Sequence, residues 1–131
     1  MTYNLRIGMR AEKAEQVTGK NTARTYGSGS IDVYATPAMI GLMEGASLAA
    51  VDPVLPAGMT TVGINVNVRH LAATPVGMTV RATAELIEIA GKRLTFKVVA
   101  YDEKEKIGEG THQRYIVETE SFLQNAEAKK K

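Results

Sequence analysis

The 131-residue sequence contains no cysteine and no tryptophan, and only two phenylalanines and two histidines. Without cysteine the chain has no disulfides, no thiolate metal sites and no cysteine nucleophile. The two histidines, His70 and His112, are too few for a histidine-rich metal cage. The few aromatic side chains argue against a platform on which nucleic-acid bases could stack. The sequence therefore implies no metal, no redox cofactor and no nucleic-acid partner.

Excess charge is also scarce, because 16 basic residues oppose 14 acidic ones and the net charge is only +2. Three of the positive charges are the terminal lysines at 129–131, so the rest of the chain has no basic excess typical of nucleic-acid binding. A composition of 44% hydrophobic and 23% charged residues indicates a globular protein, and this length fits one domain. We expect that domain at residues 1–125 and a disordered, lysine-rich tail at 126–131.

Long hydrophobic runs are missing as well. The first six residues lack the basic and apolar regions of a signal peptide. The most apolar stretch, Val33–Val51, is interrupted by Pro37 and Glu44, whereas a membrane-spanning helix needs about 20 predominantly apolar residues. We therefore expect no membrane partner and a cytoplasmic location.

The clearest secondary-structure signal is the alternation of apolar and polar residues at 62–70, which predicts a strand. A period of two places four apolar residues on one face of that strand: Val62, Ile64, Val66 and Val68. Runs rich in Val, Thr and Ile predict three more strands at 78–89, 93–101 and 107–118, which complete an antiparallel meander. Two early glycines in the last strand indicate a bulge or a close approach of another backbone. The segment 5–18 is expected to add one more strand.

One helix is predicted before these strands. Thr36 is a suitable N-cap, Pro37 is favoured at the first helical position, and the helix extends to Val51. Apolar residues surround this helix almost completely, which is typical of a buried helix. The segment 20–30 is expected to be a polar loop. One helix packed on one sheet gives an α+β fold.

Glu44 is the most informative residue, because it lies in the middle of the apolar helix. A buried carboxylate is costly unless it is paired or hydrogen-bonded. Two interpretations are open: Glu44 lies at the solvent edge, or it is a functional carboxylate. A buried carboxylate in general is suited to act as a base near neutral pH. Gly41 and Gly45 would leave space for a ligand beside it, and no charged residue three or four positions away indicates a solvated stripe.

The histidines and Thr36 are weaker candidates when each is taken alone. His70 ends the best-predicted strand beside a loop, where a side chain can reach a substrate, although histidines are also common on surfaces. His112 lies on the last predicted strand near Arg114, and its functional signal is lower. Thr36 has a sufficient structural explanation as a helix cap. The sequence has no serine in a nucleophile elbow and no phosphate-binding loop.

Three segments together are more specific than any single residue. They are Thr36–Glu44 (TPAMIGLME), His70–Gly77 (HLAATPVG) and Gly108–Arg114 (GEGTHQR). With these segments the sequence resembles the fluoroacetyl-CoA thioesterase-like branch of the hotdog-fold thioesterases over nearly the whole chain. The resemblance implies a hotdog fold, in which an antiparallel five-stranded sheet wraps around one long central helix. It also implies a homodimer that hydrolyses small acyl-CoA thioesters at its interface, and it leaves open whether dimers pair into tetramers.

By their positions in these motifs, the resemblance implies that Thr36, Glu44 and His70 are catalytic residues. It implies that Gly63 and Arg114 line or support the substrate site. Thioester hydrolysis needs a nucleophile or base, a proton-transfer group and donors to the oxyanion. Glu44 would attack the carbonyl or activate a water, His70 would transfer protons, and Thr36 would hold a carboxylate or a substrate oxygen by its hydroxyl.

Two departures from the family pattern concern the acyl group. Gly45 stands where the fluoroacetyl-specific enzyme carries a bulky aromatic residue, and the segment 20–30 offers only Tyr26 as an aromatic lid. These departures favour a general acyl-CoA thioesterase over a fluoroacetyl-specific one.

Two other functions compete with hydrolysis. One is a non-catalytic acyl-CoA or small-ligand binding protein on the same fold, because a fold does not determine a function. The other is a hotdog hydratase of enoyl thioesters. That class uses an Asp/His pair on one helix, whereas this helix offers Glu44 and no histidine, which disfavours it.

Overall fold

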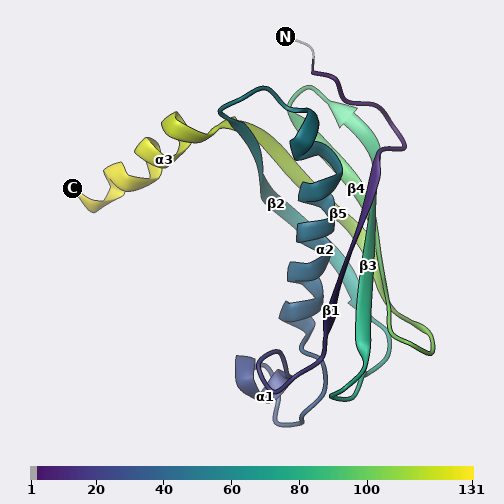
Figure 1. Cartoon of the computed structure of the whole chain (residues 1–131). Coiled ribbons are helices and arrows are strands. Elements are labelled where there is room, and N and C mark those ends of the chain that lie inside the picture. The colour runs from purple at the N-terminus through teal and green to yellow at the C-terminus, as the bar shows by residue number, and fades with distance from the viewer. Residues whose placement is uncertain (1–2) are drawn as a thin grey trace.

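A sixteen-residue helix, α2 (Thr36–Val51), runs along the inside of a curled antiparallel sheet (Figure 1). The computed structural model describes residues 3–131. The five strands are β1 (Arg10–Gln16), β2 (Met59–His70), β3 (Thr79–Ala90), β4 (Arg93–Tyr101) and β5 (Lys106–Glu118). Two shorter helices are α1 (Ala23–Tyr26) and α3 (Thr119–Glu127). The predicted α+β class, with five strands around one long central helix, is confirmed.

The strand β2 does not take the place beside β3 that a simple meander predicts. The sheet order is β1-β3-β4-β5-β2, so β3, β4 and β5 form a meander while β2 pairs with β5 and is an edge strand. The predicted four-strand meander is wrong because β1 occupies the free edge of β3, from Arg10↔Glu85 to Gln16↔Thr79. Alternation identifies strands, but it does not identify their neighbours.

The α2 helix is buried on the side that packs against the sheet. Its buried residues are Ala38, Met39, Met43, Ala46, Ser47 and Val51. They share one core cluster with Leu86, Leu94, Phe96, Ile107 and Ile116 of the sheet. The opposite side is not covered within one chain, because Gly41 is exposed and Ile40 and Leu48 are only half-buried. The prediction of a helix buried all round is therefore wrong for this side.

A β-bulge at Ile64 changes which side chains of β2 face α2. In the register with β5, the residues before and after Ile64 have partners and Ile64 has none. The residues on the α2 side are Thr61 and Gly63 before the bulge, and Val66, Val68 and His70 after it. The predicted single apolar face is therefore wrong: Val62 lies on the opposite side from Val66, and Ile64 is 51% exposed.

The strand β5 passes close to its neighbours at two glycines. A Cβ atom at Gly108 would lie 2.5 Å from the sulfur of Met39. A Cβ atom at Gly110 would overlap the backbone of Asn67 and Val68 on β2. The close backbone approach that the sequence predicts is confirmed at Gly110, while Gly108 makes room for a core methionine.

The helix α1 lies within a segment for which the sequence predicts only a polar loop. Thr22 caps this helix by accepting a hydrogen bond from the backbone N–H of Thr25, and Gly27 ends it in a left-handed conformation. The cap at each end stabilises one helical turn, so the loop prediction is wrong for Ala23–Tyr26.

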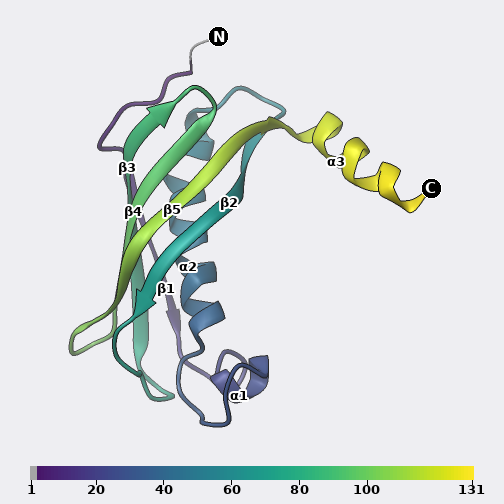
Figure 2. The same cartoon turned by 180° about the vertical axis from the view of Figure 1, so that it is seen from behind.

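The helix α3 projects away from the sheet on the side of β2 (Figures 1 and 2). It leaves Phe122 and Leu123 exposed. Residues 128–130 continue it as a 3-10 turn. The predicted disorder of 126–131 and the domain boundary at 125 stay predictions, and residues 1 and 2 of that domain lie outside the described residues. Within residues 3–131, no helix is long and apolar enough to cross a membrane.

The close approach at Gly110 predicts that Gly110→Ala destabilises the fold. The added methyl group has to push β2 away from β5, and overpacking of this kind costs roughly 1–3 kcal/mol. Gly19→Ala is the matched control, because nothing lies within 4 Å of a Cβ atom at that position. Urea unfolding measures the free energy of unfolding of both variants. Equal stability of the two would contradict the close approach.

Candidate active site

The Thr36 hydroxyl does not cap α2, contrary to the sequence prediction. Ala35 is the N-cap residue and makes no side-chain capping bond, while Thr36 is already the first helical residue. The helix therefore starts one residue earlier than predicted. The Oγ1 atom of Thr36 lies 2.7 Å from Nδ1 of His70, the last residue of β2. This hydrogen bond joins the start of α2 to the end of β2.

The His70 imidazole is held in a half-buried position beside Thr36. Its Nε2 atom is buried and has no hydrogen-bond partner in the described part of the chain. Burial lowers the pKa of His70, because the charged imidazolium would lose its hydration. A hollow next to the ring is lined by Thr36, Tyr34, Leu71 and Ala72. The ring is therefore a neutral imidazole whose Nε2 nitrogen is left without a partner among residues 3–131.

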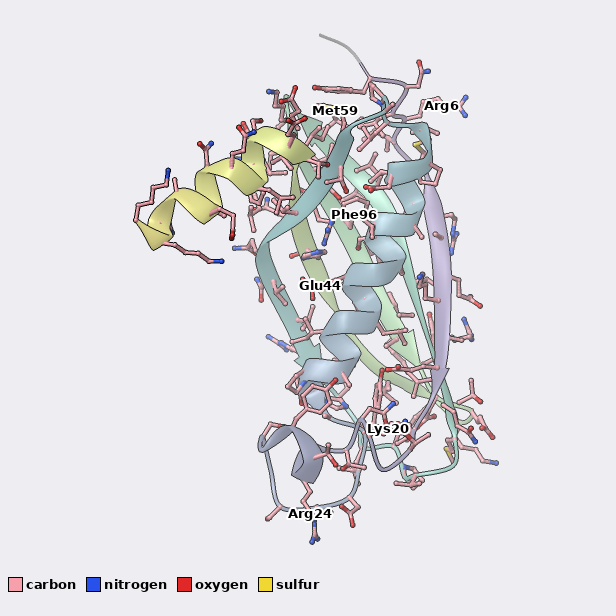
Figure 3. All side chains as sticks on the ribbon, turned by 60° about the vertical axis from the view of Figure 1, so that its left-hand side comes forward. Arg6, Lys20, Arg24, Glu44, Met59 and Phe96 are labelled. Carbon is pink, nitrogen blue, oxygen red and sulfur yellow. The ribbon has the colours of Figure 1, made fainter. Side chains whose placement is uncertain are left out.

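Glu44 lies in the middle of α2 on the side that faces β2 (Figure 3). Its side chain is half-buried, and the four ion pairs within residues 3–131 all lie elsewhere. The Oε2 atom is 2.9 Å from the position that a Cβ atom of Gly63 would occupy. The carboxylate thus occupies space that only a glycine on β2 leaves free, and it points toward the strand.

Arg114 lies beside Glu44 in a network of buried polar groups. Its Nε and Nη2 atoms donate to the hydroxyl and the carbonyl of Thr61, both at 2.8 Å. Its Nη1 atom lies 3.2 Å from Nε2 of His112. The Thr61 hydroxyl in turn donates to Asp52, the residue after α2. Arg114 therefore has several partners of its own and does not pair with Glu44.

Sequence analysis missed Thr61 and Asp52 and ranked His112 low. His112 and Arg114 are two positions apart on β5, so their side chains share a face, and that spacing could have linked them. Nothing in the sequence links Thr61 to Asp52, because the end of α2 meets the start of β2 only in the folded chain. No group of three or more His, Asp or Glu side chains suited to a metal ion occurs in residues 3–131.

The five predicted site residues form two groups in one chain. Thr36 and His70 are hydrogen-bonded to each other, whereas Glu44 lies with Gly63 and Arg114. Thr36 and Glu44 are eight positions apart on α2, which is roughly 12 Å along the helix axis. The carboxylate of Glu44 forms no ion pair with His70. One chain therefore holds the predicted catalytic residues as two half-sites.

Comparison with known proteins assigns the sequence to a family. The model of the family described as fluoroacetyl-CoA-specific thioesterase matches residues 17–120. A fluoroacetyl-CoA thioesterase from Streptantibioticus cattleyicolor is 44% identical over 100 residues, which cover 76% of this chain and 70% of that protein. The chain belongs to this thioesterase family. The resemblance inferred from the three motifs, and with it the class of acyl-CoA thioesterase, is confirmed.

Solved structures of thioesterases and of a thioesterase superfamily member superpose closely on the chain. A structure of the fluoroacetyl-CoA thioesterase FlK aligns with a TM-score of 0.90 and 37% identity, over 96% of this chain and 98% of that chain. A variant of that enzyme in complex with acetyl-CoA aligns equally well, with a TM-score of 0.90 over 95% and 98% of the two chains. A Thermus thermophilus protein described as a thioesterase superfamily member reaches a TM-score of 0.85 at 31% identity, over 95% and 94%. The predicted hotdog fold is confirmed.

The lowered pKa of both histidines predicts a loss of stability at acidic pH. Unfolded histidines bind a proton near pH 6.5, whereas burial disfavours protonation of His70 and His112 in the folded chain. The unfolded state then binds more protons, so the free energy of unfolding should fall as the pH drops below about 6.5 toward the folded-state pKa values. Above about pH 7 this contribution is fully present.

Urea unfolding of the wild type and of His70→Gln, at about pH 7.5 and about pH 5.5, measures this dependence. The variant should lose less stability between the two pH values, because one of the two titrating groups is gone. Equal losses in both proteins would show that His70 has an ordinary pKa.

Proposed function

We propose that the protein hydrolyses small acyl-CoA thioesters to the free acid and CoA, with Glu44 as nucleophile or general base. The position of the Glu44 carboxylate carries this proposal: it is half-buried, without an ion-pair partner, and directed at the space above Gly63. A carboxylate there can attack a thioester carbonyl or activate a water for the attack. Gly63 and the fixed guanidinium of Arg114 border the acyl group.

His70 is the proposed proton-transfer group. Because burial lowers its pKa, the ring is neutral and can accept a proton. If Glu44 is the general base, His70 passes the proton that Glu44 takes from the water on to the departing CoA thiolate. If Glu44 is the nucleophile, the thiolate leaves first, and His70 then takes the proton of the water that hydrolyses the acyl–Glu44 anhydride. Thr36 is its hydrogen-bonding partner, which fixes the ring through the Oγ1–Nδ1 contact of 2.7 Å. The unpartnered Nε2 atom is the nitrogen available for this transfer.

We infer that the complete site forms between two protomers. The edge strand β2 carries Gly63, which lies beside Glu44, and ends at His70. If two β2 strands pair antiparallel around a two-fold axis, the Gly63 region of one protomer lies opposite the His70 end of its partner. Glu44 of one protomer then meets Thr36 and His70 of the other, which joins the two half-sites.

Uncovered apolar surface on the β2 side supports this homodimer. An edge strand has unpaired backbone N–H and C=O groups that a second strand can satisfy. Ile64 is 51% and Val66 is 42% exposed on that strand. The half-buried side of α2, with Ile40 and Leu48, is uncovered as well. We expect the cytoplasm as the location of this dimer.

The acyl group is proposed to be small and not restricted to fluoroacetyl. The hollow beside Glu44 is lined by Gly45, Leu48, Thr61, Val62, Gly63 and Arg114, and contains no aromatic side chain. Tyr26 on α1 is 50% exposed and does not line this hollow. Without an aromatic wall the hollow offers little that would select one small acyl group over another.

A non-catalytic acyl-CoA-binding protein is the second candidate. The separation of Glu44 from His70 within one chain favours it, because a chain that does not bring the half-sites together would bind an ester without cleaving it. Release of free CoA, detected with a thiol reagent, distinguishes the two functions.

The proposed role of Glu44 predicts that Glu44→Gln hydrolyses acetyl-CoA at least about 100-fold more slowly than the wild type. The amide keeps the size of the side chain and removes the group that attacks or takes the proton. Folding should survive, since an amide is no more costly to half-bury than a carboxylate. Glu120→Gln on α3 is the matched control and should keep the wild-type rate. A wild-type rate for Glu44→Gln would exclude Glu44 as the nucleophile or general base, whereas a wild type that releases no CoA would favour the binding protein.

The shared site predicts complementation between two inactive variants. Glu44→Gln and His70→Ala homodimers each lack one group in both sites. A mixed dimer contains one site with both groups intact, so unfolding and refolding an equal mixture should restore about a quarter of the wild-type activity. Light scattering should give twice the 14.1 kDa mass of the chain for every sample. Dimers that stay inactive after mixing would place Glu44 and His70 of the same chain in one site.

A further inference from the structure

His112 is a buried polar residue that the proposed mechanism does not use. Its side chain is 1% exposed, and its ring packs on Phe96 with 6.5 Å between the ring centroids. Both ring nitrogens have partners: Nδ1 lies 2.7 Å from the backbone carbonyl of Asn65, and Nε2 lies 3.2 Å from Nη1 of Arg114. The ring therefore connects the β2 bulge to the guanidinium beside Glu44.

The two partners fix the protonation of the His112 ring. A backbone carbonyl only accepts hydrogen bonds, so Nδ1 carries the proton and donates to Asn65. A guanidinium only donates, so Nε2 is bare and accepts from Arg114. Burial lowers the pKa of His112, and the charge of Arg114 lowers it further, while the backbone contact and Glu44 oppose this. The ring is a neutral acceptor aimed at Arg114.

This acceptor completes the restraint on the guanidinium. The hydroxyl of Thr61 holds Nε, its carbonyl holds Nη2, and His112 holds Nη1. Nη1 and Oε2 of Glu44 border the same space above Gly63, 3.5 Å and 2.9 Å from its Cβ position, so a guanidinium released from His112 can turn Nη1 onto the carboxylate. An Arg114–Glu44 ion pair would occupy the carboxylate that has to react.

We propose that His112 is a positioning residue that keeps Arg114 beside Glu44 without neutralising it. The inference rests on the proposed function of Glu44. By holding Nη1, His112 leaves the carboxylate free to attack and presents a fixed positive charge to the acyl group. His112 hydrogen-bonds to Asn65 and Arg114, not to Glu44, Thr36 or His70, and acts on the carboxylate through Arg114.

Two amide substitutions separate this role from a structural one. In His112→Gln the longer side chain places an amide oxygen near the Nε2 position, where it can accept from Arg114, and gives up the bond to Asn65. In His112→Asn the shorter side chain places an amide N–H near the Nδ1 position, where it can donate to Asn65, and does not reach Arg114. His112→Gln therefore keeps only the contact with Arg114, and His112→Asn keeps only the contact with Asn65.

Positioning predicts that His112→Asn lowers kcat for acetyl-CoA about tenfold or more with little change in KM, while His112→Gln stays within about threefold of the wild type. The loss should vanish in an Arg114→Met background, because His112 then has nothing to position. A larger loss in His112→Gln, or losses that add to that of Arg114→Met, would overturn the proposal. Melting temperatures of all four variants identify any that fail to fold, and the Gln variant then carries the test.

A spectroscopic measurement separates this inference from the proposed hydrolysis. The chain has only two histidines, so nitrogen NMR of the imidazoles, assigned with His70→Ala, resolves His112 directly. The expected spectrum has a protonated Nδ1 and a bare Nε2 whose shift changes in Arg114→Met. A proton on Nε2, or a spectrum that Arg114→Met does not alter, would overturn the pairing. A wild type that cleaves no acyl-CoA but shows the expected spectrum would contradict the proposed function and keep the pairing.

Discussion

The one-residue bulge at Ile64, where β2 pairs with β5, is the constraint on which the site depends. Gly63 and His70 are seven positions apart, and an odd spacing puts two residues on opposite faces of a regular strand. The extra residue restores them to the same side, so that Gly63 faces Glu44 and His70 reaches Thr36. Without the bulge, one of the two half-sites would lie on the outer face of the sheet.

The bulge is held by groups that also shape the site. His112 donates to the Asn65 carbonyl just after the bulge and accepts from Arg114, which in turn donates to Thr61. A buried polar network is stable when its members have partners, and costly when one member is left without. In this network the partners of the arginine are neutral groups. The Glu44 carboxylate therefore forms no ion pair with Arg114 and can act as the proposed nucleophile or base.

The geometry of a single chain also explains why the proposed enzyme needs a second copy. The helix α2 holds Thr36 and Glu44 roughly 12 Å apart along its axis, and no rotamer of either side chain closes such a gap. The edge of β2 and the uncovered side of α2 lie next to both groups. A two-fold axis at that edge would pair the free backbone N–H and C=O groups of β2 with those of a second copy. The same contact would cover the apolar surface and join the two half-sites.

The sequence by itself determined the elements and the chemical groups of this protein. A run rich in β-branched residues located β4 at its observed bounds, and the apolar run located α2. The motifs around Glu44 and His70 identified the family. All of these signals are local in the sequence. The tertiary structure decided the rest. The place of β2 beside β5, the bulge, and the pairing of Thr36 with His70 depend on contacts between distant segments. Local periodicity does not encode such contacts, because they arise only when each strand finds a free edge and each buried polar group finds a partner.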